Sequence, residues 1–283
     1  MTLATAVTDT RRVLQDEPVS DSFSTAPTGT TGTSIVVGTT GLWTTGDVME
    51  FSLDGEQALV TDDSSDPTLT IVRAHNETTA GTHTTAERIL KNPTYGTVEI
   101  QEALNFVLDY ETWPQVFQFD TTTFTPDPGN TIMYDLPADY EMAVDLVQEG
   151  ASLEDLRRIG FEERLNVPTA ISTTLKALRV TSWPRTDVDA TLTYIARITS
   201  SSFPSDYEPI AALGAAARLL RTQAREEARS GESEDVSFRI LRVARETAEE
   251  EYKMAKASYR AQLLPRLQGV RRFRRRARMI ASS

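Results

Sequence analysis

Two long amphipathic helices predicted at residues 206–264 constrain this chain more than any other feature of the sequence. Their apolar residues recur with the period of an α-helix, so that each set falls on one stripe. Ser230-Gly231 ends the first helix, and Pro265 ends the second. The two stripes contain Ile210, Leu213, Ala217, Leu220, Ala224 and Ala228, and then Phe238, Leu241, Ala244, Ala248, Tyr252, Ala255, Tyr259 and Leu263.

This pattern predicts a long C-terminal helical hairpin. About 30 helical residues span roughly 45 Å, which is more than one small globule needs. Alanines on both stripes allow close approach, either over the core of the same chain or between subunits, and the sequence leaves both uses open. If the helices pack between subunits, the candidate contact residues are Leu213, Leu220, Leu241, Tyr252 and Tyr259.

A strongly basic segment follows the second helix. Residues 253–283 contain two Lys and eight Arg and no acidic side chain, which gives a local charge of +10. The whole chain has 29 basic and 41 acidic residues. Removing the ten leaves 19 basic against 41 acidic side chains, so residues 1–252 carry a charge of −22. Such asymmetry along a chain indicates charged partners.

We expect residues 265–283 to form an extended basic arm. It could dock on an acidic protein surface, bind a phosphate backbone, or remain a solvated, disordered tail. The apolar residues between the arginines favour protein docking, because they can serve as anchors. The candidate docking residues are Arg266, Arg271, Arg272, Phe273, Arg274, Arg275, Arg276, Arg278, Met279 and Ile280.

Residues 20–92 are predicted to be a small β module, a barrel or sandwich, that follows a short helix at residues 2–16. A Ser/Thr/Gly linker at residues 20–33 comes first, and Asp54-Gly55 is the strongest hairpin signal in the chain. Runs typical of strands lie at Ser34–Val37, Val48–Phe51, Gln57–Thr61 and Thr68–Arg73.

The middle of the chain is predicted to mix helices and strands. Helices are expected at Val98–Thr112 and Leu153–Leu165, and a β-hairpin at Thr174–Thr181 and Ala190–Ile198. Further strands are expected at Gln115–Phe119, Thr131–Leu136 and Met142–Gln148.

The predicted fold class is therefore α+β. It comprises a helix bundle with the long C-terminal hairpin, a β-rich core at residues 115–200, the inserted β module and the extended arm. In terms of domains, residues 1–19 and 93–264 form the main body, 20–92 the insertion and 265–283 the arm.

Two stretches carry a resemblance to virion proteins of tailed bacteriophages. Glu50–Ile89 is similar to a small β module common in these proteins. Residues 134–140 (YDLPADY) and Leu156–Ile198 resemble the head-to-tail adaptor proteins, through an L-P-x-D-Y strand, an L-x-V-x-x-x-P strand and a T-L-x-Y strand. The resemblance implies a ring, usually of twelve subunits, that lies beneath the portal and contacts the portal through the C-terminal segment. The inserted β module is not universal in that family.

No residue set indicates catalysis. The chain lacks cysteine, and it contains no G-x-S-x-G elbow, P-loop or G-x-G-x-x-G. The two histidines, His75 and His83, would need Asp62, Asp63 or Asp66 to form a metal site, and the spacing fits no common motif. We therefore expect neither a metal nor a cofactor, and no run is long enough to span a bilayer.

The sequence thus favours a structural protein of the virion that joins the portal ring to tail or nozzle proteins and continues the DNA channel. The partners expected are the portal, tail proteins and further copies of this chain, and DNA would pass an acidic lumen without specific binding. The alternative is a nucleic-acid-binding protein that acts through the arginine-rich arm. A tail-associated hydrolase is a third hypothesis, from a different class.

Overall fold

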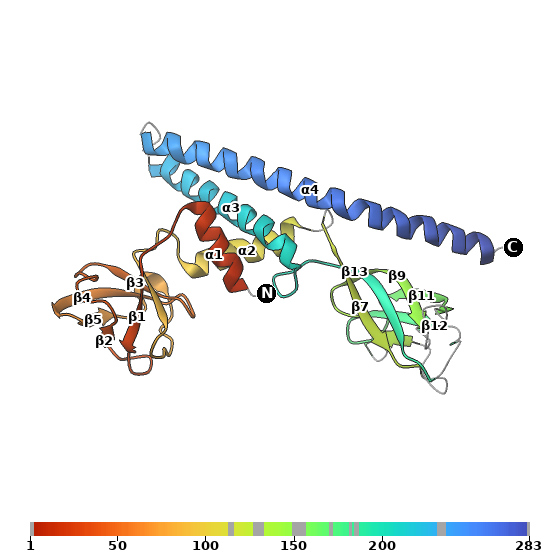
Figure 1. The fold of residues 1–283 in the computed structure, drawn as a ribbon, viewed down its shortest axis with the longest axis horizontal. Coiled ribbons are helices and arrows are strands. Elements are labelled where there is room, and N and C mark those ends of the chain that lie inside the picture. Colours follow the sequence, from red (N-terminus) through yellow and green to blue (C-terminus); the bar gives the residue numbers. More distant parts are fainter. Residues whose placement is uncertain are drawn as a thin grey trace. The chain divides into compact units, whose positions relative to one another are not determined.

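A computed structural model shows a β-rich, mixed α+β protein (Figure 1). It describes residues 3–112, 116–126, 133–148, 157–169, 172–180, 183, 187–230 and 236–281. The chain divides into two compact units. Unit 1 consists of Met1–Val107 and Glu208–Lys253, and unit 2 consists of Leu108–Tyr207 and Met254–Ser283. Each unit is described by itself.

A closed six-stranded barrel dominates unit 1, in the order β1-β2-β5-β4-β3-β6. All its neighbouring strands are antiparallel, and β1 pairs with β6 to close the barrel. Closure removes the free edges that an open sheet would expose. The strands are β1 Ser20–Thr25, β2 Ser34–Val37, β3 Val48–Phe51, β4 Gln57–Ser65, β5 Thr68–Val72 and β6 Arg88–Lys91.

The barrel interior follows from alternation along its strands. In β5, for example, Leu69 and Ile71 are buried while their neighbours are exposed, as expected where one face of each strand points inward. At the turn between β3 and β4, Gly55 adopts a φ of +74°, a conformation that favours glycine. The core comprises Phe23, Ile35, Val37, Trp43, Met49, Phe51, Ala58, Val60, Leu69, Ile71 and Ile89.

Three helices pack on one another beside the barrel within unit 1: α1 Leu3–Leu14, α2 Thr97–Phe106 and α3 Glu208–Ser230. A π-helical turn, η2 Val107–Glu111, follows α2, and a single turn, η1 His75–Glu77, follows β5. Several alanines of α3 are fully buried, which allows close packing. At Gly214 of α3 a Cβ would meet both Tyr252 and Val107 at 2.9 Å.

Unit 2 contains two open antiparallel sheets around one core. The larger has the order β10-β9-β13-β7 and the smaller β11-β12-β8. Both sheets contribute to the core, for example Leu146 and Leu192 from the larger and Leu178 from the smaller. The strands are β7 Gln118–Phe124, β8 Met133–Asp135, β9 Tyr140–Gln148, β10 Arg157–Arg158, β11 Phe161–Leu165, β12 Lys176–Val180 and β13 Ala190–Ala196, and a short turn, η4 Ser205–Tyr207, precedes α3.

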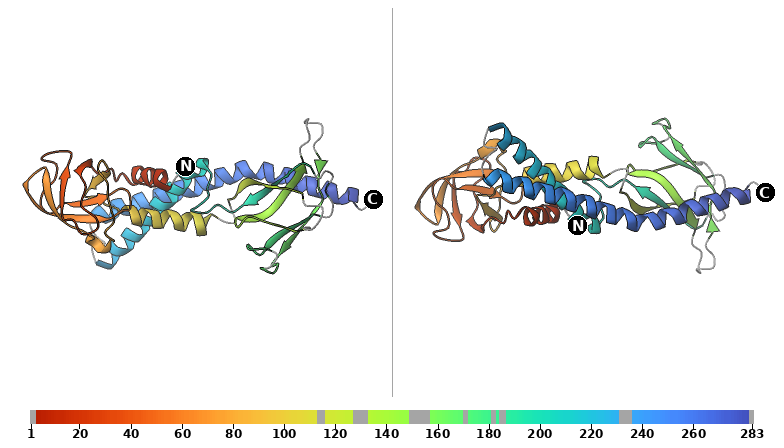
Figure 2. Two further views of the ribbon diagram at one scale, coloured as in Figure 1. Left: turned by 90° about the horizontal axis from the view of Figure 1, so that it is seen from below. Right: turned by 90° about the horizontal axis from the view of Figure 1, so that it is seen from above.

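The predicted fold class is wrong in its account of the C-terminal region. Among the residues that it describes, the structure shows neither a long helical hairpin that ends before Pro265 nor an extended arm after it. Instead, α4 Val236–Ala281 is one helix of 46 residues that contains Pro265 in its interior (Figure 2). Proline removes one backbone hydrogen bond, but the surrounding Leu, Arg, Gln and Ala residues favour helix strongly enough to continue it. Residues 231–235, between α3 and α4, lie outside the described part of the chain.

Two further predictions about unit 2 are wrong. Where a helix was expected at Leu153–Leu165, the described residues form β10 and β11. The expected hairpin of Thr174–Thr181 with Ala190–Ile198 does not form, because β12 and β13 belong to different sheets. Alternating polarity identifies a strand but not its partner. Trp113 and part of the predicted strands at Gln115–Phe119 and Thr131–Leu136 lie outside the described residues.

Candidate functional site

The basic docking residues predicted from the sequence lie in the last part of α4. Their backbone is helical, whereas their side chains lie outside the described part of the chain. These residues are Arg266, Arg271, Arg272, Phe273, Arg274, Arg275, Arg276, Arg278, Met279 and Ile280. Their role in docking stays a prediction.

The five residues predicted to pack between subunits are buried or half-buried within the chain itself. Leu241, Tyr252 and Tyr259 are each less than 10% exposed, and Leu213 and Leu220 are half-buried. In unit 2 the ring of Tyr259 lies 5.2 Å from that of Tyr207. Any surface of α4 that is open to another molecule therefore lies beside the buried face of Leu241, Tyr252 and Tyr259.

Such a surface exists in unit 1, where α1, α3 and α4 line an open groove of about 1000 Å³. Ile240 and Val243 of α4 lie in it, with exposed fractions of 65% and 62%. Val13 of α1, 37% exposed, and Leu220 of α3 add to its apolar lining. Charged side chains of both signs, including Arg239 and Glu227, also line the groove. Exposed apolar side chains gathered beside polar ones are typical of protein-binding surfaces.

Sequence reasoning missed Ile240 and Val243. They lie three residues apart on α4, so they share a helical face that differs from the face of Leu241. This second, shorter apolar face was visible in the sequence, but the stronger stripe of Leu241 and Tyr252 dominated the pattern.

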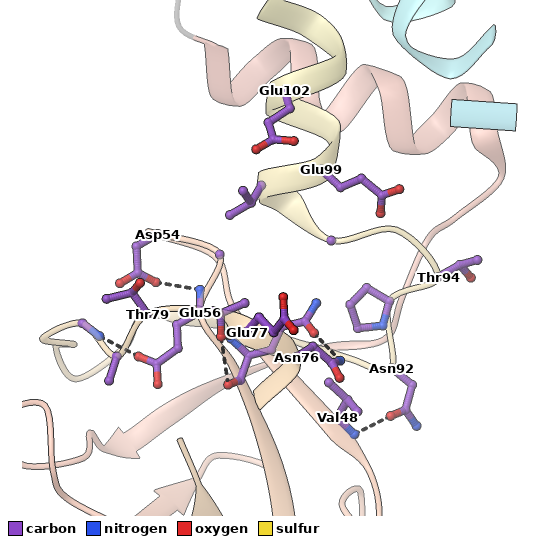
Figure 3. Close-up of a pocket in the computed structure, with 18 residues that line it drawn as sticks. Val48, Asp54, Glu56, Asn76, Glu77, Thr79, Asn92, Thr94, Glu99 and Glu102 are labelled. Atoms are coloured by element: carbon purple, nitrogen blue, oxygen red, sulfur yellow. Dashed lines mark hydrogen bonds between the residues drawn. The ribbon is translucent and has the colours of Figure 1, made fainter. Parts of the chain in front are cut away.

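A second cavity of unit 1, of about 1060 Å³, is strongly acidic (Figure 3). Glu99 and Glu102 of α2 line it from one side, and Asp54 and Glu56 line it from the loop after β3. Glu77 of η1 is a further carboxylate, and the described residues that line the cavity include no Lys, Arg or His. Burial and the nearby Glu226, Glu102 and Glu50 raise the pKa of the Glu99 carboxyl, against a backbone hydrogen bond at Gly96.

Glu56 belongs to a buried network of charged side chains beside this cavity. Arg73 donates from Nε to Glu56 Oε1 at 2.6 Å and also contacts Oε2 through Nη2. His83 Nε2 lies 2.8 Å from Glu56 Oε2, and His83 Nδ1 lies 3.1 Å from Glu87 Oε2. Burial raises the pKa of Glu56, but hydrogen bonds from Arg73, His83 and the backbone of Gly81 and Ala74 outweigh it and lower the pKa to about 2. Glu56 is therefore ionised at neutral pH.

A second buried network connects the barrel to the helices of unit 1. Arg11 of α1 pairs with Glu50 of β3 at 2.8 Å and with Asp16 at 2.6 Å. Glu50, which is fully buried, also accepts hydrogen bonds from the backbone N–H and the hydroxyl of Thr97. Thr97 opens α2, so the carboxylate lies at the positive end of the helix dipole. These contacts join α1, β3 and α2.

No family model, no curated protein and no solved structure matches the chain. Within the part of the chain that the structure describes, no helix has the length and apolar character required to cross a bilayer.

Proposed function

We propose that this protein is a structural connector, a ring-forming component of a tailed-phage virion that joins the portal to the tail. The proposal starts from the resemblance of Tyr134–Tyr140 and Leu156–Ile198 to head-to-tail adaptor proteins. The observation that carries it is the groove of unit 1, in which Ile240 and Val243 are largely exposed. A groove of this kind suits contact with a second copy of the same chain.

The contact would be heterologous, with the groove of one subunit receiving a different surface of the next. Heterologous contacts form a ring when the rotation from one subunit to the next closes on itself, and an open filament when it does not. Fully burying an apolar side chain contributes about 1.5–3 kcal/mol. Two such side chains in each of many identical interfaces therefore add substantially to the stability of a closed assembly.

The charge distribution suits a channel that DNA must cross. Residues 1–252 carry a charge of −22, so a lumen that they line repels the phosphate backbone. The end of α4 carries the opposite charge. As a helix, the 17 residues from Pro265 to Ala281 are about 25 Å long, and they would present seven arginines to acidic side chains of the portal.

The assembly state of the purified full-length chain tests the proposal, alone and with portal protein, by light scattering and negative-stain imaging. We expect closed rings for the wild type and monomers for the double variant Ile240→Glu/Val243→Glu, with an unchanged melting temperature. Leu165→Glu is the matched control, because Leu165 is 60% exposed on β11 of unit 2, and it should still form rings. Wild-type chains that stay monomeric with portal present would refute the connector function, and rings formed by the double variant would refute the role of the groove.

Nucleic-acid binding is the second candidate function, favoured by the seven arginines between residues 266 and 278. Guanidinium groups that contact phosphates release counterions, so binding would weaken steeply with salt. A chain truncated after Pro265 separates the two functions. For a connector that docks through this segment, the truncation abolishes attachment to the portal, and neither form retains duplex DNA at physiological salt. For a nucleic-acid-binding protein, the full-length chain retains DNA and the truncated chain does not.

A further inference from the structure

We propose that Asp54, Glu56 and His83 form a binding site for one divalent transition-metal ion such as Zn²⁺. The inference concerns unit 1 alone and does not depend on the connector function. Among the described residues these three offer ligand atoms, one carboxylate oxygen or ring nitrogen each, that all lie within 4.8 Å of one another. Imidazole nitrogen and carboxylate oxygen are common ligands of zinc.

The spacing of the ligand atoms fits such an ion. His83 Nε2 lies 2.8 Å from Glu56 Oε2 and 3.9 Å from Asp54 Oδ2. Ligands bound tetrahedrally at about 2.0–2.2 Å from zinc lie roughly 3.4 Å from one another. The two observed distances fall on either side of that value, and all three ligand atoms lie within 4.8 Å of one another, so side-chain movements without a change of fold would bring them into place.

The orientation of His83 is that of a metal ligand. Its other ring nitrogen, Nδ1, faces Glu87 Oε2 at 3.1 Å. Metal-binding histidines almost always donate this second N–H to a carboxylate, a backbone carbonyl or water, which fixes the tautomer and the ring plane. The ring of Phe51 lies 4.2 Å from the imidazole, and His83 is only 5% exposed. The side chain is therefore positioned by its surroundings before any ion binds.

The local charge also suits a divalent cation. Asp54, Glu56 and Glu87 bring three negative charges, and Arg73 brings one positive charge, so the cluster carries −2 when the imidazole is neutral. The ion binds the lone pair of His83 Nε2 while the neutral ring keeps its proton on Nδ1, and where both ring nitrogens carry a proton, the one on Nε2 leaves to solvent. The ion binds Glu56 through Oε2, which also accepts hydrogen bonds from Arg73 Nη2 and the Gly81 N–H. Glu56 Oε1 keeps its 2.6 Å hydrogen bond from Arg73 Nε. The buried charges are then balanced.

Access to the site comes from the acidic cavity. The side chain of Asp54 is 36% exposed, whereas those of Glu56 and His83 are fully buried. Asp54 and Glu56 both line the cavity, so an ion can enter from that side, and a water molecule can complete the coordination. The negative potential of Glu77, Glu99 and Glu102 would raise the local concentration of cations.

Titration of the metal-free full-length protein with Zn²⁺ by calorimetry, and with Co²⁺ by visible absorption, tests the site. His83→Gln and Asp54→Asn remove one ligand each, and His75→Gln is the matched control because His75 is the only other histidine. We expect one equivalent to bind to the wild type and to His75→Gln. We expect at least about 100-fold weaker binding to His83→Gln and Asp54→Asn, since even partners of ligands change affinity 10–100-fold.

The intensity of the Co²⁺ absorption distinguishes this site from carboxylates elsewhere in the cavity, because tetrahedral coordination with a nitrogen ligand absorbs more strongly than octahedral oxygen ligation. Absence of binding by the wild type would overturn the proposal and leave a network of hydrogen bonds only. Binding to His83→Gln with wild-type affinity would also overturn it, because the ion would then occupy other carboxylates. If His83→Gln does not fold, Asp54→Asn decides, since Asp54 is partly exposed.

Discussion

The barrel of unit 1 and the paired sheets of unit 2 bury different kinds of side chain. Near the barrel, six acidic, basic or histidine side chains of the described residues are less than 10% exposed: Arg11, Asp16, Asp47, Glu50, Glu56 and His83. In the described part of unit 2, the buried polar residues Thr112, Gln148 and Ser172 are uncharged. The ion pairs formed by side chains of β11 and β12 are exposed, as for Arg164 with Glu162, whose side chains are 48% and 51% exposed.

This difference shows how each region is joined to its surroundings. The two sheets of unit 2 share a core of aliphatic and aromatic side chains, and such contacts depend little on direction. The barrel meets α1 and α2 through Arg11, Glu50 and Thr97, whose ion pair and hydrogen bonds are directional. Removal of one partner of a buried ion pair is costly because the other charge is left without compensation. The barrel should therefore respond to changes of charge that the sheets tolerate.

The largest effect is expected from Glu56→Gln in unit 1. Arg73, whose side chain is 6% exposed, would lose its carboxylate partner, and the expected loss of stability is about 3–5 kcal/mol. The matched change in unit 2 is Glu162→Gln, which should alter stability by no more than about 0.5 kcal/mol. Urea denaturation gives the change in the free energy of unfolding for each variant. Hydrogen exchange over residues 20–91 and 118–196 shows in which of the two regions the change arises. Equal losses for the two variants would remove the contrast between the regions.

Acid should destabilise the barrel by a similar or slightly smaller amount. The pKa of Glu56 is lowered to about 2 from a usual value of 4.5, so its ionised form stabilises the folded state. This contribution is complete above about pH 4.5 and is lost as the pH falls through 2. The difference between a pKa of 4.5 and one of about 2 corresponds to about 3 kcal/mol of folding free energy. Asp47, with a pKa also near 2, acts in the same direction.

Hydrogen exchange at pH 6 and near pH 3 measures this acid effect. Protection of residues 20–91 should fall more than that of residues 118–196. In Glu56→Gln the fall should be smaller than in the wild type, since the titrating group is gone. An equal pH dependence in the variant would show that other carboxylates cause the loss.

The barrel strands could be predicted from the sequence because their signals are local. The predicted runs Ser34–Val37 and Val48–Phe51 have the bounds of β2 and β3, and the Asp54-Gly55 turn joins β3 to β4. Closure could not be predicted, since β1 lies in a segment that reads as a Ser/Thr/Gly linker and pairs with β6 more than 60 positions later. Long-range pairing of this kind leaves no local pattern.

The metal-ligand cluster was missed for the same reason. From the sequence, His83 could be matched only with the nearby Asp62, Asp63 or Asp66, and the spacing fitted no motif. The structure brings His83 to Asp54 and Glu56, which precede it by 29 and 27 positions on the other side of β4 and β5. A closed barrel places residues together according to strand order rather than distance along the chain.

Glycine substitutions should also change the stability of the two regions differently, by a smaller amount than the changes at Glu56. In Gly55→Ala the new Cβ would lie 2.8 Å from Val98 Cγ2, at a φ of +74° that disfavours side chains. We expect a loss of about 1–3 kcal/mol. Gly160→Ala in unit 2 meets nothing within 4 Å, so it should leave stability unchanged or slightly raised. Thermal unfolding measures both, and a destabilised Gly160→Ala would contradict the open space at that position.

The smallest effect is expected from Tyr134→Phe, which removes one hydroxyl from the apolar core of unit 2. Trp183 donates its indole N–H to this hydroxyl at 3.1 Å, and the two rings pack edge to face at 5.4 Å. Phenylalanine keeps the ring contact and loses the hydrogen bond from Trp183, so the expected cost is about 1 kcal/mol. In the barrel, Trp43 instead donates to the carboxylate of Asp21 at 3.1 Å, and Asp21→Ala should cost more, about 1.5–3 kcal/mol, because the acceptor is charged. Urea denaturation compares the two variants. If Tyr134→Phe lost more stability than Asp21→Ala, hydrogen bonds in unit 2 would matter as much as the charged contacts of the barrel. The proposed difference between the two regions would then not hold for these hydrogen bonds.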